Sequence, residues 1–337
     1  MKISAALPTG VAALLFDAAR RRRDLETRIV EALEEAGYGE VILPILDYLE
    51  PYRSLLPAAS RRELYRFVDR DGETIALRSD FTPMLARLLA PRLGSMQLPL
   101  RLYYRGDVVR YHEEQAGRMR EFYQVGAEIL GVEEAAADRE ALTLFLRFLC
   151  FSESRPLRVV MGFAGALDDL LLELVDGDDA GALLHAVEMR NRSAAAHSDV
   201  LRQVVELGEP RDPAALGPAA EPRLRRLLAL RDELRREFPQ VRLSVDLAEF
   251  ASYTLRPELA EVRGSDRGYY DGFMFRGYAG ARGVPVGGGG RYDAIFGALD
   301  SQVSAVGFAL GLERMLNGHR GGARPAPVAG TGGEGGR

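Results

Sequence analysis

The sequence of 337 residues has almost none of three residue types on which many active sites depend. Lys2 is its only lysine, so we expect neither a P-loop lysine nor an interior lysine that forms a Schiff base. Cys150 is its only cysteine, which excludes an intrachain disulfide and a cysteine metal cluster. Its apolar neighbours favour a buried thiol over a nucleophile. The 4 histidines form no pair at helical ligand spacing, so we expect no metal and no cofactor.

Long apolar runs are also missing. No stretch of about 18 apolar residues occurs, and the first residues lack the apolar centre of a signal peptide. We therefore expect no membrane contact and a cytoplasmic location. The net charge of −5 argues against nucleic-acid binding over the whole surface. An apolar content of 47% with 28% charged residues is typical of a soluble globular protein.

The hydrophobic pattern predicts an α+β protein. Apolar residues at helical spacing predict helices at residues 16–37, 82–93 and 133–151. Short apolar or alternating runs predict strands at 40–46, 65–68, 74–78, 157–161, 241–247, 269–278 and 306–310, with a strand pair around 102–128. A sequence of this kind can form a sheet with helices packed against it.

Composition divides the chain into four parts. Residues 165–240 are rich in Leu, Ala, Glu and Arg and hold no cluster of chemically active side chains, which favours a helical insertion. We expect it to separate the first part of a core, residues 1–164, from its second part, residues 241–317. Residues 318–337 are dominated by Gly, Pro and Ala, so we expect a disordered tail.

The most informative stretch runs from Arg101 to Gly131, where two strand-like runs flank a polar loop. Alternation along the second run places Gln124, Gly126 and Glu128 on one face. Polar side chains on an inward face need partners, because burying them unpaired is unfavourable. Arginines in the loop suit an anionic group, whereas the carboxylate and the amide suit a cationic or hydrogen-bonding group. The pattern therefore predicts the floor of a binding pocket.

This stretch closely resembles motif 2 of the class II aminoacyl-tRNA synthetases, in particular the histidyl branch. Residues 40–51, with Pro44, resemble motif 1, and AVGFALGLERML at 305–316 resembles motif 3. LRSDFT at 77–82 resembles the histidyl LRPEGT, while RGYYDGFMF and GGGGRYDAIFG resemble the histidyl RGLDYY and GGRYDGL. The matches occur in order over roughly residues 5–317. The resemblance implies a class II synthetase-like core, an antiparallel sheet flanked by helices, with the helical insertion.

The resemblance also implies a histidine-binding site. Asp80 and Thr82 stand where the histidyl family holds the α-amino group of the amino acid, and a carboxylate beside an ammonium is the expected chemistry. Gln124 and Glu128 match the glutamine and glutamate that bind histidine in that family. These four residues would therefore contact the ligand.

Five further residues are assigned by the same resemblance. Tyr269 and Tyr270 match the tyrosine pair that lines the imidazole pocket. Arg110 matches the motif 2 arginine, which holds the α-phosphate and the amino-acid carboxylate. Phe122 stands where an aromatic ring stacks on adenine, and Arg314 matches the motif 3 arginine on the γ-phosphate. The last two would form a vestigial nucleotide site.

Structural alternatives stay open for several of these residues. Asp80 could cap a helix, and the two tyrosines could be core aromatics. Arg314 could be a surface residue of a helix, and the glycine run at 287–290 could be a mobile turn. Gln124 and Glu128, on the inward face of the motif 2 strand, are harder to explain by packing alone than the residues just named.

Departures from the synthetase pattern affect its chemistry. His112 stands where the family has a glutamate that manages ATP and magnesium, which weakens a metal-assisted attack on ATP. Ser265 stands at the spacing of the catalytic arginine, and Ser79 replaces the proline of LRPEGT. After the motif 3 segment, the sequence has no counterpart of the anticodon-binding domain. We therefore expect no catalytic residue.

A sequence that keeps the residues of the histidine pocket and lacks catalytic residues of the synthetases resembles the regulatory subunits of ATP phosphoribosyltransferase. That resemblance implies a non-catalytic protein that the short-form catalytic subunit requires in the first step of L-histidine biosynthesis. It implies a part in feedback control by histidine. It further implies a homodimer within a hetero-oligomer such as a hetero-octamer, with no tRNA bound.

Two other functions stay open. A histidyl-tRNA synthetase-like enzyme would activate histidine with ATP, and it would need the missing arginine and a C-terminal domain supplied elsewhere. A paralogue recruited as an amino-acid ligase or sensor could use the unusual insert at 251–267 to reshape the pocket rim.

Overall fold

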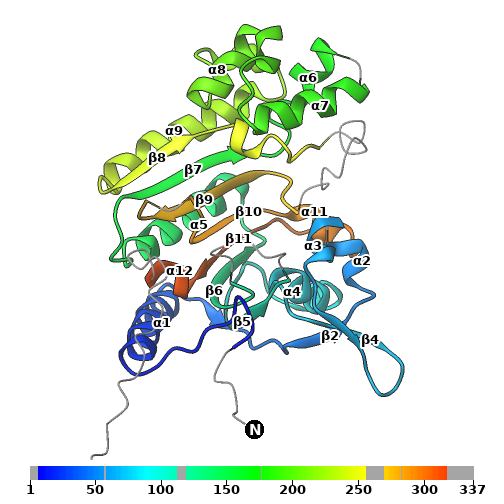
Figure 1. Ribbon diagram of the computed structural model, residues 1–337, viewed down its shortest axis with the longest axis vertical. Helices are drawn as coiled ribbons and strands as arrows, with labels where there is room; N and C mark the ends of the chain where they lie inside the picture. The colour runs from blue at the N-terminus through cyan, green and yellow to red at the C-terminus, as the bar shows by residue number, and fades with distance from the viewer. Residues whose placement is uncertain are drawn as a thin grey trace, which may run out of the picture.

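The computed structural model describes residues 7–56, 58–111, 119–175, 177–255, 269–281 and 283–316. Its centre is an eight-stranded sheet in the order β1-β5-β6-β11-β10-β9-β7-β8 (Figure 1). The strands are β1 (Gly39–Glu40), β5 (Leu100–Val109), β6 (Glu121–Leu130), β7 (Leu157–Phe163), β8 (Val241–Val245), β9 (Phe273–Ala279), β10 (Gly287–Arg291) and β11 (Ala305–Gly311). Only the two outermost pairs, β1 with β5 and β7 with β8, are parallel. The predicted antiparallel sheet therefore has a parallel pair at each edge.

Helices surround this sheet. They are α1 (Asp17–Glu35), α2 (Tyr52–Leu55), α3 (Ala58–Arg62), α4 (Thr82–Leu89), α5 (Glu134–Leu149), α6 (Asp168–Leu174), α7 (Gly177–Glu188), α8 (Asp199–Leu207), α9 (Glu221–Glu237), α11 (Asp293–Gly297) and α12 (Leu312–Leu316). Short 3-10 turns occupy Ala90–Ser95, Ala194–His197, Pro213–Leu216 and Ala248–Phe250. None of the helices in the described ranges combines the length and hydropathy of a membrane span.

The two faces of the sheet differ in chemistry. Along β6, Val125, Ala127 and Ile129 join the main hydrophobic core with α1 and α5. Because side chains alternate along a strand, Gln124 and Glu128 point to the other face. The predicted alternation of this strand is thus confirmed, and one face is left for a polar site.

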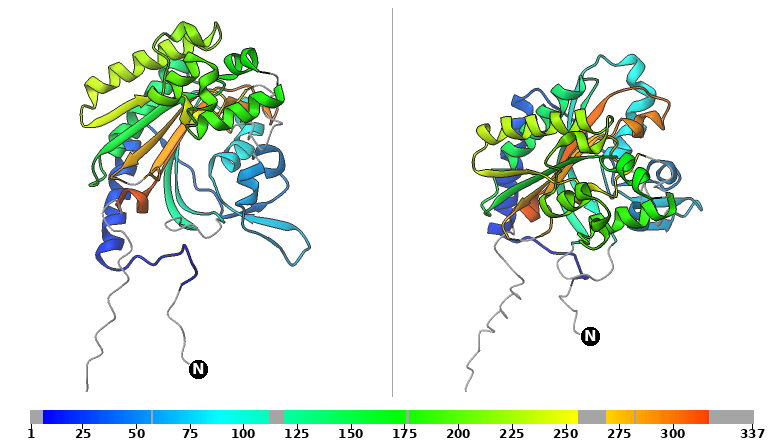
Figure 2. Two further views of the ribbon diagram at one scale, coloured as in Figure 1. Left: turned by 45° about the horizontal axis from the view of Figure 1, so that its top comes forward. Right: turned by 90° about the horizontal axis from the view of Figure 1, so that it is seen from above.

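Helix α1 forms because its apolar residues recur on one side. Leu25, Ile29 and Leu33 are buried in the main core. Figure 2 shows α1 beside α12, although the two helices lie near opposite ends of the described chain. Arg22 of α1 forms an ion pair of 3.4 Å with Glu313 of α12. This ion pair therefore joins α1, the first helix, to α12, the last one.

A smaller sheet packs beside the large one in the order β2-β4-β3. Its strands are β2 (Leu46–Tyr48), β3 (Arg66–Val68) and β4 (Thr74–Leu77), so the predicted hairpin at 65–78 is confirmed. The strand predicted at 40–46 is wrong, because the chain leaves the large sheet after Glu40 and enters the small one at Leu46. Pro44 lies in the link, has no N–H for a ladder, and accepts a hydrogen bond of 3.0 Å from Arg78.

Helices α6 to α9 lie between β7 and β8 in the chain and cover one end of the sheet (Figure 1). Parallel neighbours need a crossover of this kind, since a tight turn cannot join them. The helical segment therefore connects β7 to β8, and β8 adds one strand to the edge of the sheet. The domain limits at residues 164 and 240 stay a prediction, and the tail at 318–337 lies outside the described residues.

The glycine run at 287–290 is strand β10, so the mobile-turn alternative is wrong. β10 pairs with β9 on one side and β11 on the other. A Cβ atom on Gly289 would lie 2.2 Å from the carbonyl oxygen of Gly307. Glycine is therefore required for this close approach of strands.

Cys150 is half-buried, whereas the sequence predicted a buried thiol, and partial burial raises the pKa of this thiol.

Candidate functional site

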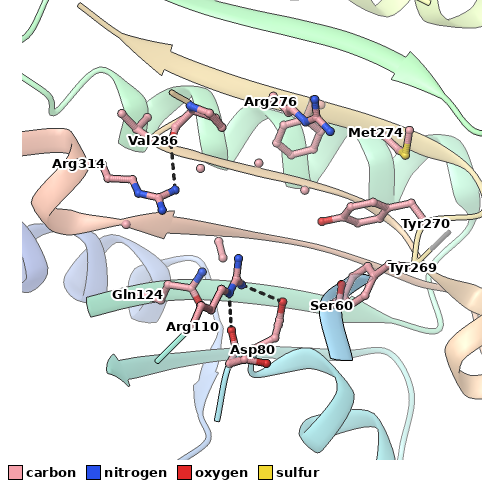
Figure 3. Close-up of a pocket in the computed structure, with 18 of the residues that line it drawn as sticks. Ser60, Asp80, Arg110, Gln124, Tyr269, Tyr270, Met274, Arg276, Val286 and Arg314 are labelled. Atoms are coloured by element: carbon pink, nitrogen blue, oxygen red, sulfur yellow. Dashed lines mark hydrogen bonds and ion pairs between the residues drawn. The ribbon is translucent and has the colours of Figure 1, made fainter. Parts of the chain in front are cut away.

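A cavity of about 280 Å³ lies on the polar face of the large sheet. Its walls come from the start of α4, the ends of β5 and β6, the strands β9 to β11, and α12 (Figure 3). Seven of the residues expected from the sequence line it: Asp80, Arg110, Phe122, Gln124, Tyr269, Tyr270 and Arg314. Segments that lie almost 240 residues apart in the chain are thus brought to one place.

Arg110 and Asp80 form one wall of this cavity. Their side chains make an ion pair of 3.4 Å, and Arg110 also donates from Nε to the Ser79 carbonyl at 2.7 Å (Figure 3). Asp80 accepts a hydrogen bond from the backbone N–H of Thr82 at 3.1 Å. Asp80 stands one residue before the N-cap Phe81, and no side chain caps α4, so the capping alternative is not confirmed. Asp80 thus holds the turn that leads into α4 and also faces the cavity.

Phe122 lies close to two arginines. The guanidinium of Arg314 is 4.6 Å from the ring centroid, and that of Arg110 is 5.5 Å away. Arg314 also donates to the Pro285 carbonyl at 3.3 Å. The surface-residue alternative for Arg314 is wrong, because its side chain lines the cavity. Two cations near an aromatic face give this end of the cavity a positive potential.

Gln124 lies on the cavity floor with only 8% of its surface exposed. Its side-chain oxygen is buried and has no hydrogen-bond partner among the described residues. A buried amide oxygen without a partner is rare in folded proteins, because desolvation without a hydrogen bond costs free energy. The position calls for a donor from a bound molecule.

A smaller cavity of about 30 Å³ adjoins the first and shares part of its lining, including Asp80, Tyr269 and Tyr270. Glu128, which is 1% exposed, forms its floor. The hydroxyl of Thr82 donates to Oε1 of Glu128 at 2.6 Å, and that of Tyr292 donates to Oε2 at 2.6 Å. Burial raises the pKa of Glu128 to about 7, although both hydroxyls act in the opposite direction. The carboxyl group can therefore change its charge near neutral pH.

Tyr269 and Tyr270 line both cavities. Their rings meet edge to face with centroids 4.9 Å apart, and Tyr269 lies 6.1 Å from the ring of Tyr292. Burial raises the pKa of both phenols, so both stay neutral hydroxyl groups. The core-aromatic alternative holds only in part, since the pair packs on neighbours and also faces the cavities. A flat, hydrogen-bonding ligand group would fit beside them.

The family model described as histidyl-tRNA synthetase matches residues 10–315. A protein from Moorella thermoacetica named ATP phosphoribosyltransferase regulatory subunit is 34% identical over 341 residues, which cover 96% of this chain and 84% of that protein. The chain belongs to this family of histidyl-tRNA synthetase-like regulatory subunits.

Solved structures agree with the fold. A chain from Bacillus halodurans, described as an ATP phosphoribosyltransferase regulatory subunit/histidyl-tRNA synthetase, superposes with a TM-score of 0.77 at 24% identity, over 95% of this chain and 85% of that one. A chain of an ATP phosphoribosyltransferase complex from Thermotoga maritima gives 0.63 at 22%, over 86% of this chain and 97% of that one. The predicted class II synthetase-like core is therefore confirmed.

Several pocket residues of this family member were not foreseen. Tyr104, Tyr253 and Arg276 line the cavities together with Tyr292. Arg276 donates to the Tyr253 hydroxyl at 3.2 Å and lies 5.0 Å from the ring centroid of Phe250. Alternation along β9 could have indicated Arg276, and the GGGGRYD motif contained Tyr292. Tyr104 gave no such signal.

Glycines of two sheet strands make room for the regulatory subunit's pocket. A Cβ atom on Gly126 would lie 2.4 Å from the hydroxyl oxygen of Tyr104, and one on Gly307 would lie 1.5 Å from Oε2 of Glu128. Both side chains therefore lie flat on the sheet only because the strand beneath them has no side chain.

Two departures from the synthetase pattern, at His112 and Ser265, lie outside the described residues, as do residues 256–267 of the insert predicted at 251–267. Within the described ranges, no group of three or more His, Cys, Asp or Glu residues could hold a metal ion. The pocket of this regulatory subunit thus offers hydrogen bonds, charges and aromatic faces to a ligand.

Proposed function

We propose that the chain is a non-catalytic regulatory subunit that binds L-histidine and acts with the short-form catalytic subunit of ATP phosphoribosyltransferase. Family membership supports the regulatory role. The buried, unpaired oxygen of Gln124 supports the binding role, because it needs a donor that a ligand supplies.

Histidine has the chemical groups that this pocket matches. Its ammonium suits Asp80, its carboxylate suits Arg110, and an imidazole N–H suits Gln124 or the deeper Glu128. Thr82, which we also expected at the ammonium, has its hydroxyl engaged with Glu128. The tyrosine pair gives the imidazole ring an aromatic wall. We propose Phe122 and Arg314 as remnants of a nucleotide site, without a role in ATP chemistry.

Feedback control requires histidine to bind two states of the complex with different affinity. In the proposed arrangement, histidine favours a state in which the catalytic subunit is less active. Linkage then demands that the catalytic subunit also change the affinity of this chain for histidine.

A homodimer inside a larger hetero-oligomer, such as a hetero-octamer, forms part of the proposal. Large apolar side chains in and near the small sheet are exposed: Ile42, Leu46, Tyr48, Phe67 and Val68. Leu46, Tyr48 and Phe67 share one face of this sheet, because Tyr48 and Phe67 both lie opposite Ile75 and Leu46 stands two residues before Tyr48. This apolar patch is typical of a protein interface, since exposed apolar area gains free energy by leaving water. The proposal also includes a cytoplasmic location, where the ATP used by the catalytic subunit is available, and no binding of tRNA.

A Gln124→Leu variant tests the binding role by calorimetry with L-histidine. Leucine fills the space of glutamine but removes the unpaired buried oxygen, so the free energy of unfolding should stay equal or increase. The loss of a ligand hydrogen bond should raise the Kd for histidine about tenfold or more. Gln240→Leu, at an exposed residue, serves as control and should leave the Kd unchanged. An unchanged Kd in the Gln124 variant would remove the support for the histidine pocket.

A further inference from the structure

A second cavity of about 280 Å³ lies on the helix-covered face of the large sheet, between α5 and α9. Phe273 of β9 lines this cavity, whereas its neighbour Met274 lines the first one. Because successive side chains of a strand point to opposite faces, the two cavities lie on opposite sides of the sheet. They share no lining residue.

The floor of the second cavity is apolar. Phe163 and Phe273 face each other on paired strands, and Leu227 of α9 covers them from the helix side. All three side chains are buried. A ligand on this floor would gain free energy by removing apolar surface from water.

Most charged side chains around this floor already have an ion-pair partner. The pairs are Arg139–Glu233 at 2.8 Å, Arg226–Glu134 at 3.3 Å and Asp138–Arg291 at 2.7 Å. Each of these charges is therefore neutralised in the free protein, and none of them needs a ligand.

Arg223 is the exception. Its guanidinium carbon lies 4.5 Å from the ring centroid of Phe163, and it forms no ion pair or hydrogen bond with any other described residue. Partial burial lowers the pKa of Arg223, although the carboxylates of Glu134, Asp168 and Asp271 act in the opposite direction from a longer range than an ion pair. A guanidinium offers five N–H donors in a planar fork that suits carboxylate and phosphate oxygens.

We propose that the cavity between α5 and α9 is a second binding site, which takes a small organic anion with an apolar ring or chain. The anionic group pairs with Arg223, and the apolar part lies on Phe163, Phe273 and Leu227. The volume is at the lower end of the range for ligand sites, so a single ring fits the site better than a nucleotide does. This site is independent of the proposed histidine pocket.

Calorimetry on the full chain tests the chemical class with four probes. Phenyl phosphate and benzoate combine a ring with an anion, inorganic phosphate has only the anion, and benzyl alcohol has only the ring. We expect the two ring anions to bind with a Kd about tenfold or more below those of the other two. Equal binding of inorganic phosphate, or no binding of ring anions at millimolar concentration, would overturn the proposal.

Variants on α9 locate the site. Arg223→Met should raise the Kd for phenyl phosphate about tenfold or more, since it removes the charged donor. Arg225→Met is the matched control, because Arg225 is exposed on the same helix and pairs with Glu221. It should leave the Kd unchanged. Ala229→Trp, at an exposed lining residue, should block the cavity while Arg223 stays in place.

Three outcomes would contradict this location. If Gln124→Leu loses phenyl phosphate binding and Arg223→Met keeps it, the anion binds in the first cavity. Unchanged binding in Ala229→Trp would also contradict the site, and this variant serves if the Arg223 variant fails to fold. Full displacement of phenyl phosphate by the catalytic subunit alone would show that a protein surface occupies the cavity.

Discussion

The carboxyl group of Glu128 is held by hydroxyl groups from elements that lie far apart in the chain. Thr82 begins α4, and Tyr292 precedes α11. Strand alternation placed Glu128 on an inward face, and that much could be predicted from the sequence. Its two hydroxyl partners could not, because tertiary packing alone brings Thr82 and Tyr292 to it.

Burial of Glu128 predicts how stability depends on pH. Its pKa is raised from 4.5 to about 7 in the folded protein, so the folded state binds more protons than the unfolded state between these values. The stabilisation is complete below pH 4.5 and is lost as the pH rises through about 7, a change on the order of 3 kcal/mol. Glu128→Gln removes it, because glutamine does not titrate.

Urea unfolding from pH 4.5 to 8 measures this difference. The free energy of unfolding of the parent protein should fall relative to that of Glu128→Gln as the pH rises. Glu140→Gln is the control. The pKa of Glu140 is lowered in the folded protein, so its contribution to the free energy of unfolding is lost only as the pH falls below this range. A constant difference between the parent and Glu128→Gln over this range would show that Glu128 titrates normally.

At the scale of elements, apolar spacing was enough to predict α1, α5 and the hairpin β5–β6. It failed where tertiary contacts end an element. The helix predicted at 82–93 ends at Leu89 and continues as a 3-10 turn to Ser95, and the strand predicted from residue 269 begins at Phe273. The residues before Phe273 instead form the aromatic wall of the pocket. Here side-chain packing overrides the local pattern.

The pairing of β6 with β11 supports a prediction at Gly307. Gly307 lies opposite Glu128 in the register, and an added Cβ atom would lie 1.5 Å from the Glu128 carboxylate and 2.7 Å from the Ala127 carbonyl. Gly307→Ala should therefore displace Glu128, cost about 1–3 kcal/mol of unfolding free energy and weaken histidine binding.

Gly297→Ala is the matched control for this variant. No atom lies within 4 Å of its added Cβ atom, and Gly297 lies at the end of α11. It should leave the free energy of unfolding within about 1 kcal/mol of the parent value. Thermal unfolding and histidine calorimetry compare the two. Equal behaviour of both variants would show that the sheet yields at Gly307.

At the scale of the whole molecule, the order of the family motifs could be predicted from the sequence, but their assembly into two adjoining cavities could not. Asp80, Gln124 and Arg314 meet because α4, β6 and α12 converge on one face of the sheet. No pattern in the sequence indicated the separate cavity between α5 and α9. Phe163 and Arg223 come from β7 and α9, and the crossover alone brings them together.

The exposed apolar patch predicts a homodimer. Phe67 of β3 is 45% exposed and shares the face of Leu46 and Tyr48, so Phe67→Asp should fold normally and yet bury a charge in the proposed interface. We expect the mass measured by analytical ultracentrifugation to fall from dimer to monomer. Val284→Asp, at a residue that is 46% exposed elsewhere, should leave the dimer intact. A dimer of unchanged affinity in the Phe67 variant would place the interface on another surface.

Regulation of the transferase is the central claim, and one measurement tests it most directly. A purified short-form catalytic subunit is assayed for phosphoribosyl-ATP formation alone, with this chain, and with this chain plus histidine. We expect activity only in the mixture, inhibition by histidine, and loss of that inhibition when the chain carries Glu128→Ala. No activation by the well-folded chain, or inhibition that persists unchanged in Glu128→Ala, would contradict the account.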